Sequence, residues 1–263
     1  MQLDLSGRHA LVCGASQGIG RASAIELAEL GASVTLLARS AGALKTVAES
    51  LPHKHAGQRH GWRSVDMLDT ASLQATASEI AAGEAVHILI NNSGGPPGGP
   101  AYAATPAAFE TAFRQHLLAG QTLLQALLPG MRASGYGRIV NVISTSVKEP
   151  IAGLGVSNTV RAAVAGWAKT LSGELAADGI TVNNVLPGYT RTGRLDGLLT
   201  AKAAACGRAE EEIAQDLIAT IPARRFGEAG EVAAVIAFLC TPAAAYVNGV
   251  SIAVDGGRTR ALS

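Results

Sequence analysis

Short apolar runs alternate with amphipathic segments along the whole chain. The first run, from Ala10 to Cys13, ends at a glycine, and apolar positions at helical spacing then continue from Ile19 to Leu30. Nearly continuous apolar runs are typical of parallel strands covered on both faces, and apolar residues three and four positions apart indicate helices. The same patterns predict further strands at 33–39, 62–66, 86–92, 138–144, 180–186 and 250–254, and helices at 41–50, 70–82, 105–131, 157–177 and 228–239.

The regular alternation of strands and helices predicts an α/β fold, a Rossmann-type doubly wound parallel sheet of about seven strands. The chain has 263 residues, and no linker rich in proline, glycine and serine separates two apolar blocks. We therefore expect a single domain over residues 1–263. The helical region 105–131 is expected to be interrupted near residues 110–112, and residues 191–225 form an irregular segment that contains helix.

Glycine and polar residues gather where the predicted strands end. The first strand runs into Gly14, Gly18 and Gly20, which let the backbone bend tightly and pass close to a ligand. A helix begins there, and its free N–H groups and dipole favour a phosphate. Taken alone, such a turn is equally compatible with a tight connection that binds nothing. Ligands of these sheets bind at the carboxyl ends of the strands. The carboxyl ends of the later strands carry Ala38-Arg39, Asp66-Met67, Asn92-Ser93-Gly94, Ser144 and Pro187-Gly188.

Composition narrows the class of protein. Apolar residues make up 48% of the chain and charged residues 16%, which fits a large core and a buried subunit interface. The net charge of +1 argues against a nucleic-acid partner, which needs a concentrated basic face. No apolar run approaches the roughly 20 residues of a bilayer span, and the N-terminal residues lack the pattern of a signal peptide. The three cysteines are odd in number and far apart, which favours reduced thiols in the cytoplasm.

A polar stretch from His53 to His60 contains three histidines and raises the question of a metal site. Metal-binding histidines are held on regular structure at fixed spacing. Gly57 and the polar neighbours instead indicate a solvated connection between a helix and a strand. We therefore predict a loop here, and no metal site in the protein.

Four segments together resemble the short-chain dehydrogenase/reductase family, and the resemblance covers essentially the whole chain. Cys13–Gly20 is similar to the family's TGxxxGIG turn, Asn91–Gly94 to its NNAG segment, Pro187–Thr192 to its PGxxxT segment, and Val254–Gly257 to the end of its last strand. The nearest type is the 3-oxoacyl-carrier-protein reductase. The resemblance implies a nicotinamide cofactor held by Gly14, Ser16, Gln17, Gly18, Ile19, Gly20, Asp66, Met67, Asn92, Ser93, Gly94, Arg161, Pro187, Gly188, Thr190 and Thr192.

The end of the second strand predicts which cofactor is bound. Members of the family that prefer NAD place an acid there to hold the ribose 2′-hydroxyl, whereas this chain has Ala38 followed by Arg39. An acid repels a 2′-phosphate, while an arginine offers it a planar set of donors. We therefore predict NADP(H). The alternative is that Arg39 is an ordinary solvated charge at a helix start.

The catalytic positions are where this sequence departs from the family. The resemblance implies a Ser, then a Tyr and a Lys at YxxxK spacing, and an Asn on the preceding long helix. Ser144 matches the Ser, but Ser157 stands at the Tyr position thirteen residues later and Arg161 stands at the Lys position. His116 stands at the Asn position, and no YxxxK occurs nearby in another register. Ser144, Ser157, Arg161 and His116 are the candidate catalytic residues.

These changes weaken the expected proton donor. A serine hydroxyl is a far weaker acid than a phenol with a pKa of about 10, and Arg161 stays charged and cannot relay a proton. Ser144 and Ser157 could still donate two hydrogen bonds to a carbonyl oxygen, with Arg161 on the cofactor ribose. His116, whose ordinary pKa suits proton transfer, and Tyr189 are the alternative donors. Equally, His116 could be a satisfied helix-face residue and Tyr189 a pocket wall.

Residues 191–225 occupy the place of the family's substrate lid. Gly193, Gly197 and Gly207 suit a mobile segment. Its apolar residues fit either a substrate with an apolar portion or the packing of the segment's own helices: Leu195, Leu198, Leu199, Ile213, Leu217 and Ile218. Apolar stripes on the helices 105–131 and 157–177 predict subunit packing in a homo-oligomer, a tetramer or a dimer.

The leading hypothesis is an NADP(H)-dependent oxidoreductase that moves hydride between nicotinamide and a small-molecule carbonyl or alcohol, with a non-standard proton donor. The first alternative is a catalytically impaired NADP(H)-binding protein with a structural or regulatory role. The second is an enzyme that uses the altered site for different chemistry.

Overall fold

One parallel sheet of seven strands organises the chain, in the order β3-β2-β1-β4-β5-β6-β9. The computed structural model describes residues 1–262. The chain starts in the middle of the sheet, builds outward to β3 and then crosses to β4, so that β1 and β4 are parallel neighbours at the point where the winding reverses. The strands are β1 (His9–Cys13), β2 (Ser33–Ala38), β3 (His60–Ser64), β4 (Ile88–Asn91), β5 (Gly137–Val142), β6 (Ile180–Pro187) and β9 (Ser251–Val254).

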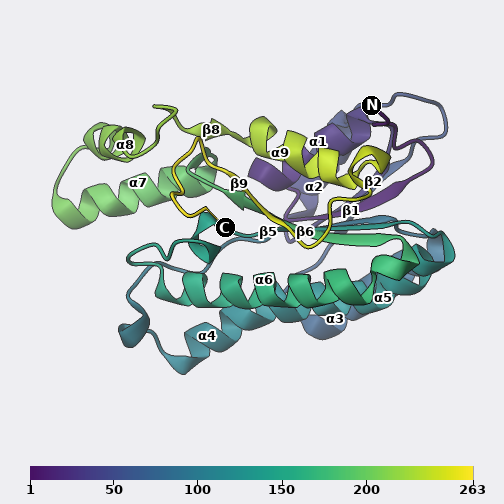
Figure 1. Cartoon of the computed structure of the whole chain (residues 1–263), viewed down its shortest axis with the longest axis horizontal. Coiled ribbons are helices and arrows are strands. Elements are labelled where there is room, and N and C mark those ends of the chain that lie inside the picture. Colours follow the sequence, from purple (N-terminus) through teal and green to yellow (C-terminus); the bar gives the residue numbers. More distant parts are fainter. Residues whose placement is uncertain (263) are drawn as a thin grey trace.

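Helices cover both faces of this sheet (Figure 1). α1, α2 and α9 lie on one face, and α3, α5 and α6 lie on the other. This arrangement confirms the predicted doubly wound fold. The helices are α1 (Gly18–Glu29), α2 (Ala41–Ser50), α3 (Thr70–Gly83), α4 (Pro106–Phe113), α5 (Ala119–Ala133), α6 (Gly155–Glu174), α7 (Gly193–Cys206), α8 (Glu210–Ala219) and α9 (Ala229–Cys240).

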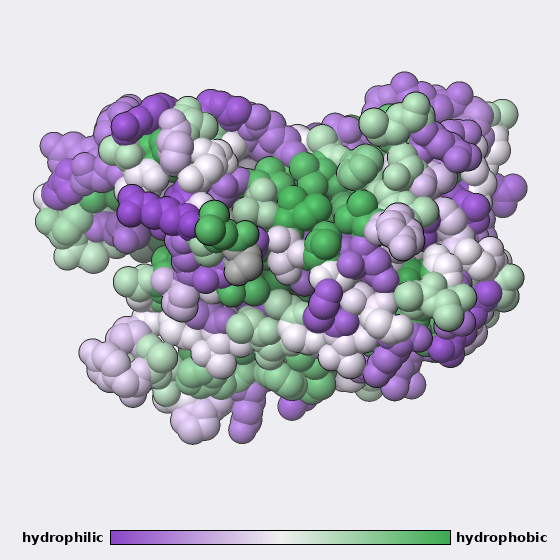
Figure 2. Space-filling model, viewed as in Figure 1, coloured by the Kyte–Doolittle hydropathy of each residue, from purple (hydrophilic) through white to green (hydrophobic). Residues whose placement is uncertain are grey.

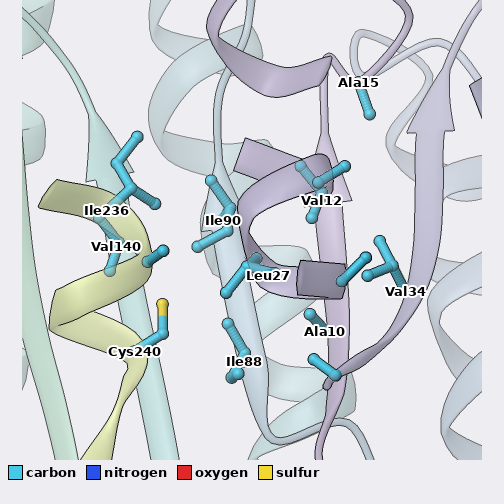
Figure 3. Close-up of a cluster of buried hydrophobic side chains, with 14 of the residues drawn as sticks. Ala10, Val12, Ala15, Leu27, Val34, Ile88, Ile90, Val140, Ile236 and Cys240 are labelled. Carbon is cyan, nitrogen blue, oxygen red and sulfur yellow. The ribbon is translucent and has the colours of Figure 1, made fainter. Parts of the chain in front are cut away.

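The apolar strands explain why the sheet needs both layers. Successive side chains of a strand point to opposite faces, so a strand that is apolar throughout must be covered twice. On one face Val12 and Ile90 pack with Leu27 of α1 and Ile236 of α9 (Figure 3). The other face of the same strands packs on α3 and α5 in a second cluster that includes Leu11, Leu89 and Ile139.

The helical region between β4 and β5 is continuous rather than broken. α4 passes into a π-helical turn at Arg114–Leu118 and then directly into α5, so the predicted interruption near residues 110–112 is wrong. The irregularity lies slightly later and takes the form of a wider turn. Such turns are frequent at functional sites, and this one carries His116.

Residues 190–228 extend beyond the carboxyl edge of the main sheet. β7 (Thr190–Arg191) and β8 (Gly227–Glu228) form a small parallel sheet of their own. The chain between these two strands forms α7 and α8, which extend outward (Figure 1). The apolar residues of this segment pack together around Leu195, Ile221 and Phe226. Of the two uses considered for this apolar side, the structure shows the packing of the segment's own helices.

The surface is mixed in character. Within residues 1–262 no helix combines the length and the apolarity that crossing a membrane requires. Figure 2 shows polar and apolar side chains interspersed over one face, with apolar ones gathered over α9 and β9.

Candidate active site and cofactor groove

The glycine turn between β1 and α1 is shaped for a close ligand. Gly14 and Gly18 have φ values of +60° and +56°, in the left-handed region that other residues rarely adopt. A Cβ at Gly14 would lie 2.6 Å from Asn92 Nδ2, and one at Gly20 would overlap the Gly14 carbonyl oxygen. The first turn of α1 contains no acidic residue. Its free N–H groups and dipole therefore fit a pyrophosphate, and the turn also contains Ser16, Gln17 and Ile19.

Asn92 holds this turn from the neighbouring strand. It follows β4 directly, and its Nδ2 donates to the carbonyl oxygens of Cys13 and Gly14, each at 3.3 Å. The amide thus satisfies two main-chain acceptors at the point where β1 bends into the turn. Gly94, two residues later, accepts a hydrogen bond of 3.1 Å from Gln115 Nε2. The segment 92–94 therefore links the glycine turn to the helix that carries His116.

Arg39, Asp66 and Met67 lie at the carboxyl ends of β2 and β3, beside that turn. Ser64 Oγ donates to the Arg39 carbonyl oxygen at 2.8 Å, which fixes the backbone while the side chain stays exposed. Asp66 accepts from the Leu68 N–H at 3.0 Å and so shapes the turn that contains Met67. An exposed guanidinium at this edge could pair with a phosphate group.

The segment after β6 packs against β9 and reaches the glycine turn. A Cβ at Gly188 would lie 2.6 Å from Asp255 Cβ, so the chain from Pro187 to Gly188 passes directly against the end of β9. Thr190 and Thr192 follow, and a Cβ at Gly18 would lie 3.2 Å from Thr192 Cγ2. The structure thus brings the two ends of the predicted cofactor site together across a narrow gap.

Arg161 and Ser157 form a buried pair on α6. Arg161 Nε donates to Ser157 Oγ at 3.1 Å, and Arg161 Nη1 donates to the carbonyl oxygens of Ile143 at 2.7 Å and Val142 at 3.3 Å. Burial and the nearby charge of Arg194 lower the pKa of Arg161 to about 10, so it remains charged at neutral pH. The arginine therefore ties α6 to the end of β5 and directs a charged donor at the Ser157 oxygen.

Ser144 stands at the same end of β5. It caps a short 3₁₀ turn, Thr145–Val147, and its Oγ accepts from the Ser146 N–H at 3.1 Å. Because the oxygen acts as an acceptor in that bond, the hydroxyl hydrogen remains available to a ligand. Two serine hydroxyls thus stand at the site, each with an N–H donating into its oxygen.

His116 lies in the π-helical turn and faces the loop after β4. Its Nδ1 is 2.9 Å from Ser93 Oγ, and its Nε2 is buried without a hydrogen-bond partner in the described residues. Burial and then the charges of Arg161 and Arg194 lower the pKa of His116 to about 3. The expectation that its pKa suits proton transfer is therefore wrong in this structure: the imidazole is neutral and acts as a hydrogen-bonding group.

We expect His116 to make the protein less stable as the pH falls from 6.5 toward about 3. The unfolded imidazole takes up a proton over this range and the folded one does not, so acid favours unfolding by up to about 1.4 kcal/mol per pH unit. Urea unfolding of the wild type and of His116→Gln gives the free energy of unfolding of each protein at each pH. The difference between the two should stay constant above pH 6.5, and below it the wild type should lose stability more steeply than the variant. The same pH dependence in both proteins would contradict the lowered pKa.

Arg194, at the start of α7, is a site residue that the sequence did not indicate. Its Nη1 donates to the Gly95 carbonyl oxygen at 3.1 Å. A Cβ at Gly95 would lie 2.6 Å from Arg194 Nη2 and 3.2 Å from Arg161 Nη2, so the loop after β4 passes between the two arginines. No local pattern could have predicted this contact, because it joins segments 99 residues apart.

A row of buried amides crosses the sheet below the site. Asn91 Nδ2 donates to Asn141 Oδ1 and Asn141 Nδ2 donates to Asn184 Oδ1, both at 2.9 Å. Asn184 Nδ2 then donates to Ser251 Oγ at 3.1 Å. The row connects β4, β5, β6 and β9, because these residues are register partners in the sheet. An asparagine within each of three apolar strands was the signal in the sequence that could have predicted it.

The histidines of the stretch 53–60 have separate partners. His55 Nε2 is 3.1 Å from the Gly31 carbonyl oxygen, and His60 Nε2 is 3.1 Å from that of Pro52. His60 also belongs to β3, so the strand begins earlier than predicted. Residues 1–262 contain no group of three or more His, Cys, Asp or Glu side chains arranged to hold a metal ion.

Known proteins share this chain's sequence and fold over nearly its full length. A family model described as enoyl-(acyl carrier protein) reductase matches residues 14–259. The 3-oxoacyl-[acyl-carrier-protein] reductase FabG of Vibrio harveyi is 32% identical over 97% of this chain and 98% of its own. The NADPH-dependent reductase BacG of Bacillus subtilis is 31% identical over 98% of this chain and 100% of its own. The structure of L-sorbose reductase from Gluconobacter frateurii, complexed with NADPH and L-sorbose, matches with a TM-score of 0.93 at 30% identity and covers 100% of both chains.

The chain belongs to the short-chain dehydrogenase/reductase family. The match of the family model, the relatives of similar length and the parallel sheet all support this assignment. It confirms the resemblance that the four sequence segments indicated. It also places the protein among the oxidoreductases.

Proposed function

We propose that the protein is an NADP(H)-dependent oxidoreductase that interconverts a small-molecule carbonyl and an alcohol, with Ser144 and Ser157 holding the reacting oxygen. The observation that carries the proposal is the hydrogen bond of 3.1 Å from Arg161 Nε to Ser157 Oγ. The start of α1 after the glycine turn, where no acidic residue lies in the first helical turn, supports the cofactor site. Exposed Arg39 and the NADPH named for BacG and L-sorbose reductase favour NADP(H). When bound, this cofactor supplies or accepts the hydride.

Ser157 is the proposed donor to the substrate oxygen. Its own oxygen accepts from Arg161, so its hydrogen is free to point at a carbonyl. A cationic donor behind the hydroxyl strengthens the bond that the hydroxyl makes, because hydrogen bonds in a chain polarise one another. Ser144 gives the second hydrogen bond. Two fixed donors at the position where negative charge develops stabilise an alkoxide, as in an oxyanion hole, and the alkoxide then takes its proton from solvent water.

His116 is proposed to position the site and not to move the proton. Nδ1 of its neutral ring is 2.9 Å from Ser93 Oγ, and Ser93 lies on the loop proposed to form part of the cofactor site. Tyr189 packs against Phe226 with ring centres 6.2 Å apart and lies beneath Arg258, so it is part of the pocket wall. Neither residue replaces the two serines as the donor.

Incubation with NADPH and a panel of ketones, aldehydes and acyl thioesters tests this proposal. We expect NADPH oxidation with at least one of them. NADPH binding detected by fluorescence, with no oxidation of any substrate and none restored by Ser157→Tyr together with Arg161→Lys, would favour the alternative of a cofactor-binding protein without catalysis. Products other than an alcohol or a carbonyl would favour different chemistry at the altered site.

Arg39→Ala is expected to weaken NADPH binding by about ten- to hundredfold, because a charge-assisted contact with the 2′-phosphate is lost. NADH has no 2′-phosphate, so its affinity should change little. Fluorescence titration of both cofactors measures the two effects. Tighter binding of NADH than NADPH by the wild type, or unchanged NADPH affinity in the variant, would contradict the assignment.

We also propose a homo-oligomer, a tetramer or a dimer, in the cytoplasm. Phe113 and Leu118 are 39% and 41% exposed on the long helical region, and Phe238 of α9 and Val250, just before β9, are each 36% exposed. Figure 2 shows apolar side chains gathered over α9 and β9. Large apolar groups gathered on a surface favour subunit packing. The cysteines in residues 1–262 are free, which suits a reducing compartment. The segment 191–225 is proposed as the substrate lid.

A further inference from the structure

A cavity of about 280 Å³ lies beside the turn that follows Ser144, and its charged lining consists of two cationic side chains and one carboxylate. Thr145 and residues 149–152 form one side of it. The other sides come from Tyr189, from Lys202 of α7, and from Arg258 and Thr259 after β9. Figure 1 places the C-terminal end of the described chain between α7 and α6, where these segments meet.

Arg258 is a cationic group of this cavity that forms no ion pair within residues 1–262. Its guanidinium carbon lies 4.8 Å from the centre of the Tyr189 ring, so the side chain is stacked on the pocket wall. Its Nε is buried and has no acceptor among residues 1–262. Thr259 Oγ1 is also buried and has no hydrogen-bond partner among these residues. Buried polar atoms of folded proteins almost always have partners. Two unpartnered atoms on adjacent residues beside a cavity therefore point to a ligand.

The acids near Arg258 are engaged elsewhere. Glu149 Oε1 accepts from the N–H groups of Arg260 and Ala261, both at 2.6 Å. Asp255 accepts from the N–H groups of Gly257 at 3.0 Å and Thr259 at 2.7 Å. None of the ion pairs formed within residues 1–262 includes Arg258 or Lys202. The carboxylates thus hold the segment that carries Arg258 without neutralising it.

We propose that Arg258 and Lys202 bind a carboxylate of the substrate, whose carbonyl then reaches Ser144 and Ser157. This inference rests on the proposed function and narrows its substrate class to oxo acids and the corresponding hydroxy acids. A guanidinium matches a carboxylate with two parallel donors, and the Thr259 hydroxyl supplies a further one. The cavity lining carries two positive charges and the one negative charge of Glu149, which suits a monoanion. Its volume fits a small molecule.

Calorimetric titration with linear oxo acids of increasing length, and with their methyl esters, tests this subsite. The protein is titrated alone and with NADP⁺. We expect at least one oxo acid to bind about ten- to hundredfold more tightly than its ester, because only the acid makes the charge-assisted hydrogen bonds. Arg258→Gln should remove this difference, and Arg258→Lys should retain part of it.

Two further variants serve as controls. Arg260→Gln makes the same change of charge two residues away. The main-chain N–H of residue 260, which donates to Glu149, is kept in this variant, so the full preference for the acid should remain. Glu149→Gln keeps an acceptor oxygen for the tail and removes a negative charge, so it should strengthen oxo-acid binding severalfold. Thermal unfolding of each variant verifies that its fold is retained.

Equal affinities for acids and esters, or a preference that survives in Arg258→Gln, would overturn the proposal. The binding measurement is separate from turnover. An oxo acid that binds through Arg258 but is never reduced with NADPH would therefore contradict the proposed function and leave the subsite standing. A protein that reduces neutral ketones but binds acids and esters equally well would contradict the subsite and leave the proposed function standing.

Discussion

Ser157→Ala is expected to lower kcat/KM for carbonyl reduction by about 10²- to 10³-fold, the usual effect of removing one hydrogen-bond donor to a developing oxyanion. The variant removes the hydroxyl that would face the substrate and leaves Arg161 without one of its acceptors. Arg161 keeps its hydrogen bonds to the carbonyl oxygens of Ile143 and Val142, so the end of β5 should stay in place. NADPH affinity should therefore change far less than turnover.

Thr159→Ala is the matched control for this variant. Thr159 lies on the same helix, is exposed, and donates only to the Gly155 carbonyl oxygen at 3.0 Å. Its loss should leave both turnover and cofactor binding close to those of the wild type. Steady-state kinetics with the best substrate of the panel, together with NADPH titration, separate the two effects. Full activity of Ser157→Ala would exclude Ser157 as the donor and direct attention to Ser144.

Gly14→Ala is expected to raise the Kd for NADPH at least about tenfold, the equivalent of one charge-assisted hydrogen bond. At φ +60° a Cβ would lie 2.6 Å from Asn92 Nδ2 and 2.7 Å from the Asn92 carbonyl oxygen. The turn must then shift, and with it the N–H groups that would face the pyrophosphate. The strain should also destabilise the fold by about 1–3 kcal/mol.

Gly42→Ala shows what the same change does without a clash. Gly42 lies in α2, and a Cβ there would meet nothing within 4 Å. This variant should be as stable as the wild type or more stable, by about 0.4–1 kcal/mol, with unchanged NADPH affinity. Cofactor titration and urea unfolding of both variants give the comparison. Undiminished NADPH binding by Gly14→Ala would show that the glycine turn serves the chain connection alone.

Much of the fold could be predicted because its signals are local. Apolar runs such as Ile88–Asn91 and the glycine stops between strands depend on neighbours in the chain, and the strands lie close to where the patterns placed them. The continuity of the long helical region was harder. No residue pattern indicated the π-helical turn at Arg114–Leu118, through which α4 passes into α5 without a break.

The sequence could predict that the strand ends meet, but not how the side chains there interact. Because parallel strands end at one edge, the residues at their carboxyl ends had to meet, and Gly18 and Thr192 do face each other. The pKa of His116 was misjudged because it depends on burial and on two arginines from distant segments. Arg194 and Arg258 carried no local signal, since their contacts with Gly95 and Tyr189 form only in the folded chain.

The sequence by itself determined the doubly wound sheet, the glycine turn after the first strand and the family, because each rests on spacing along the chain. It also placed Ser144, Ser157 and Arg161 at the positions where the family has its catalytic groups. Only the tertiary structure decided how these groups interact. Desolvation and long-range contacts pair Arg161 with Ser157, keep His116 neutral and leave Arg258 Nε without an acceptor among residues 1–262, and none of these is encoded in a short stretch of sequence.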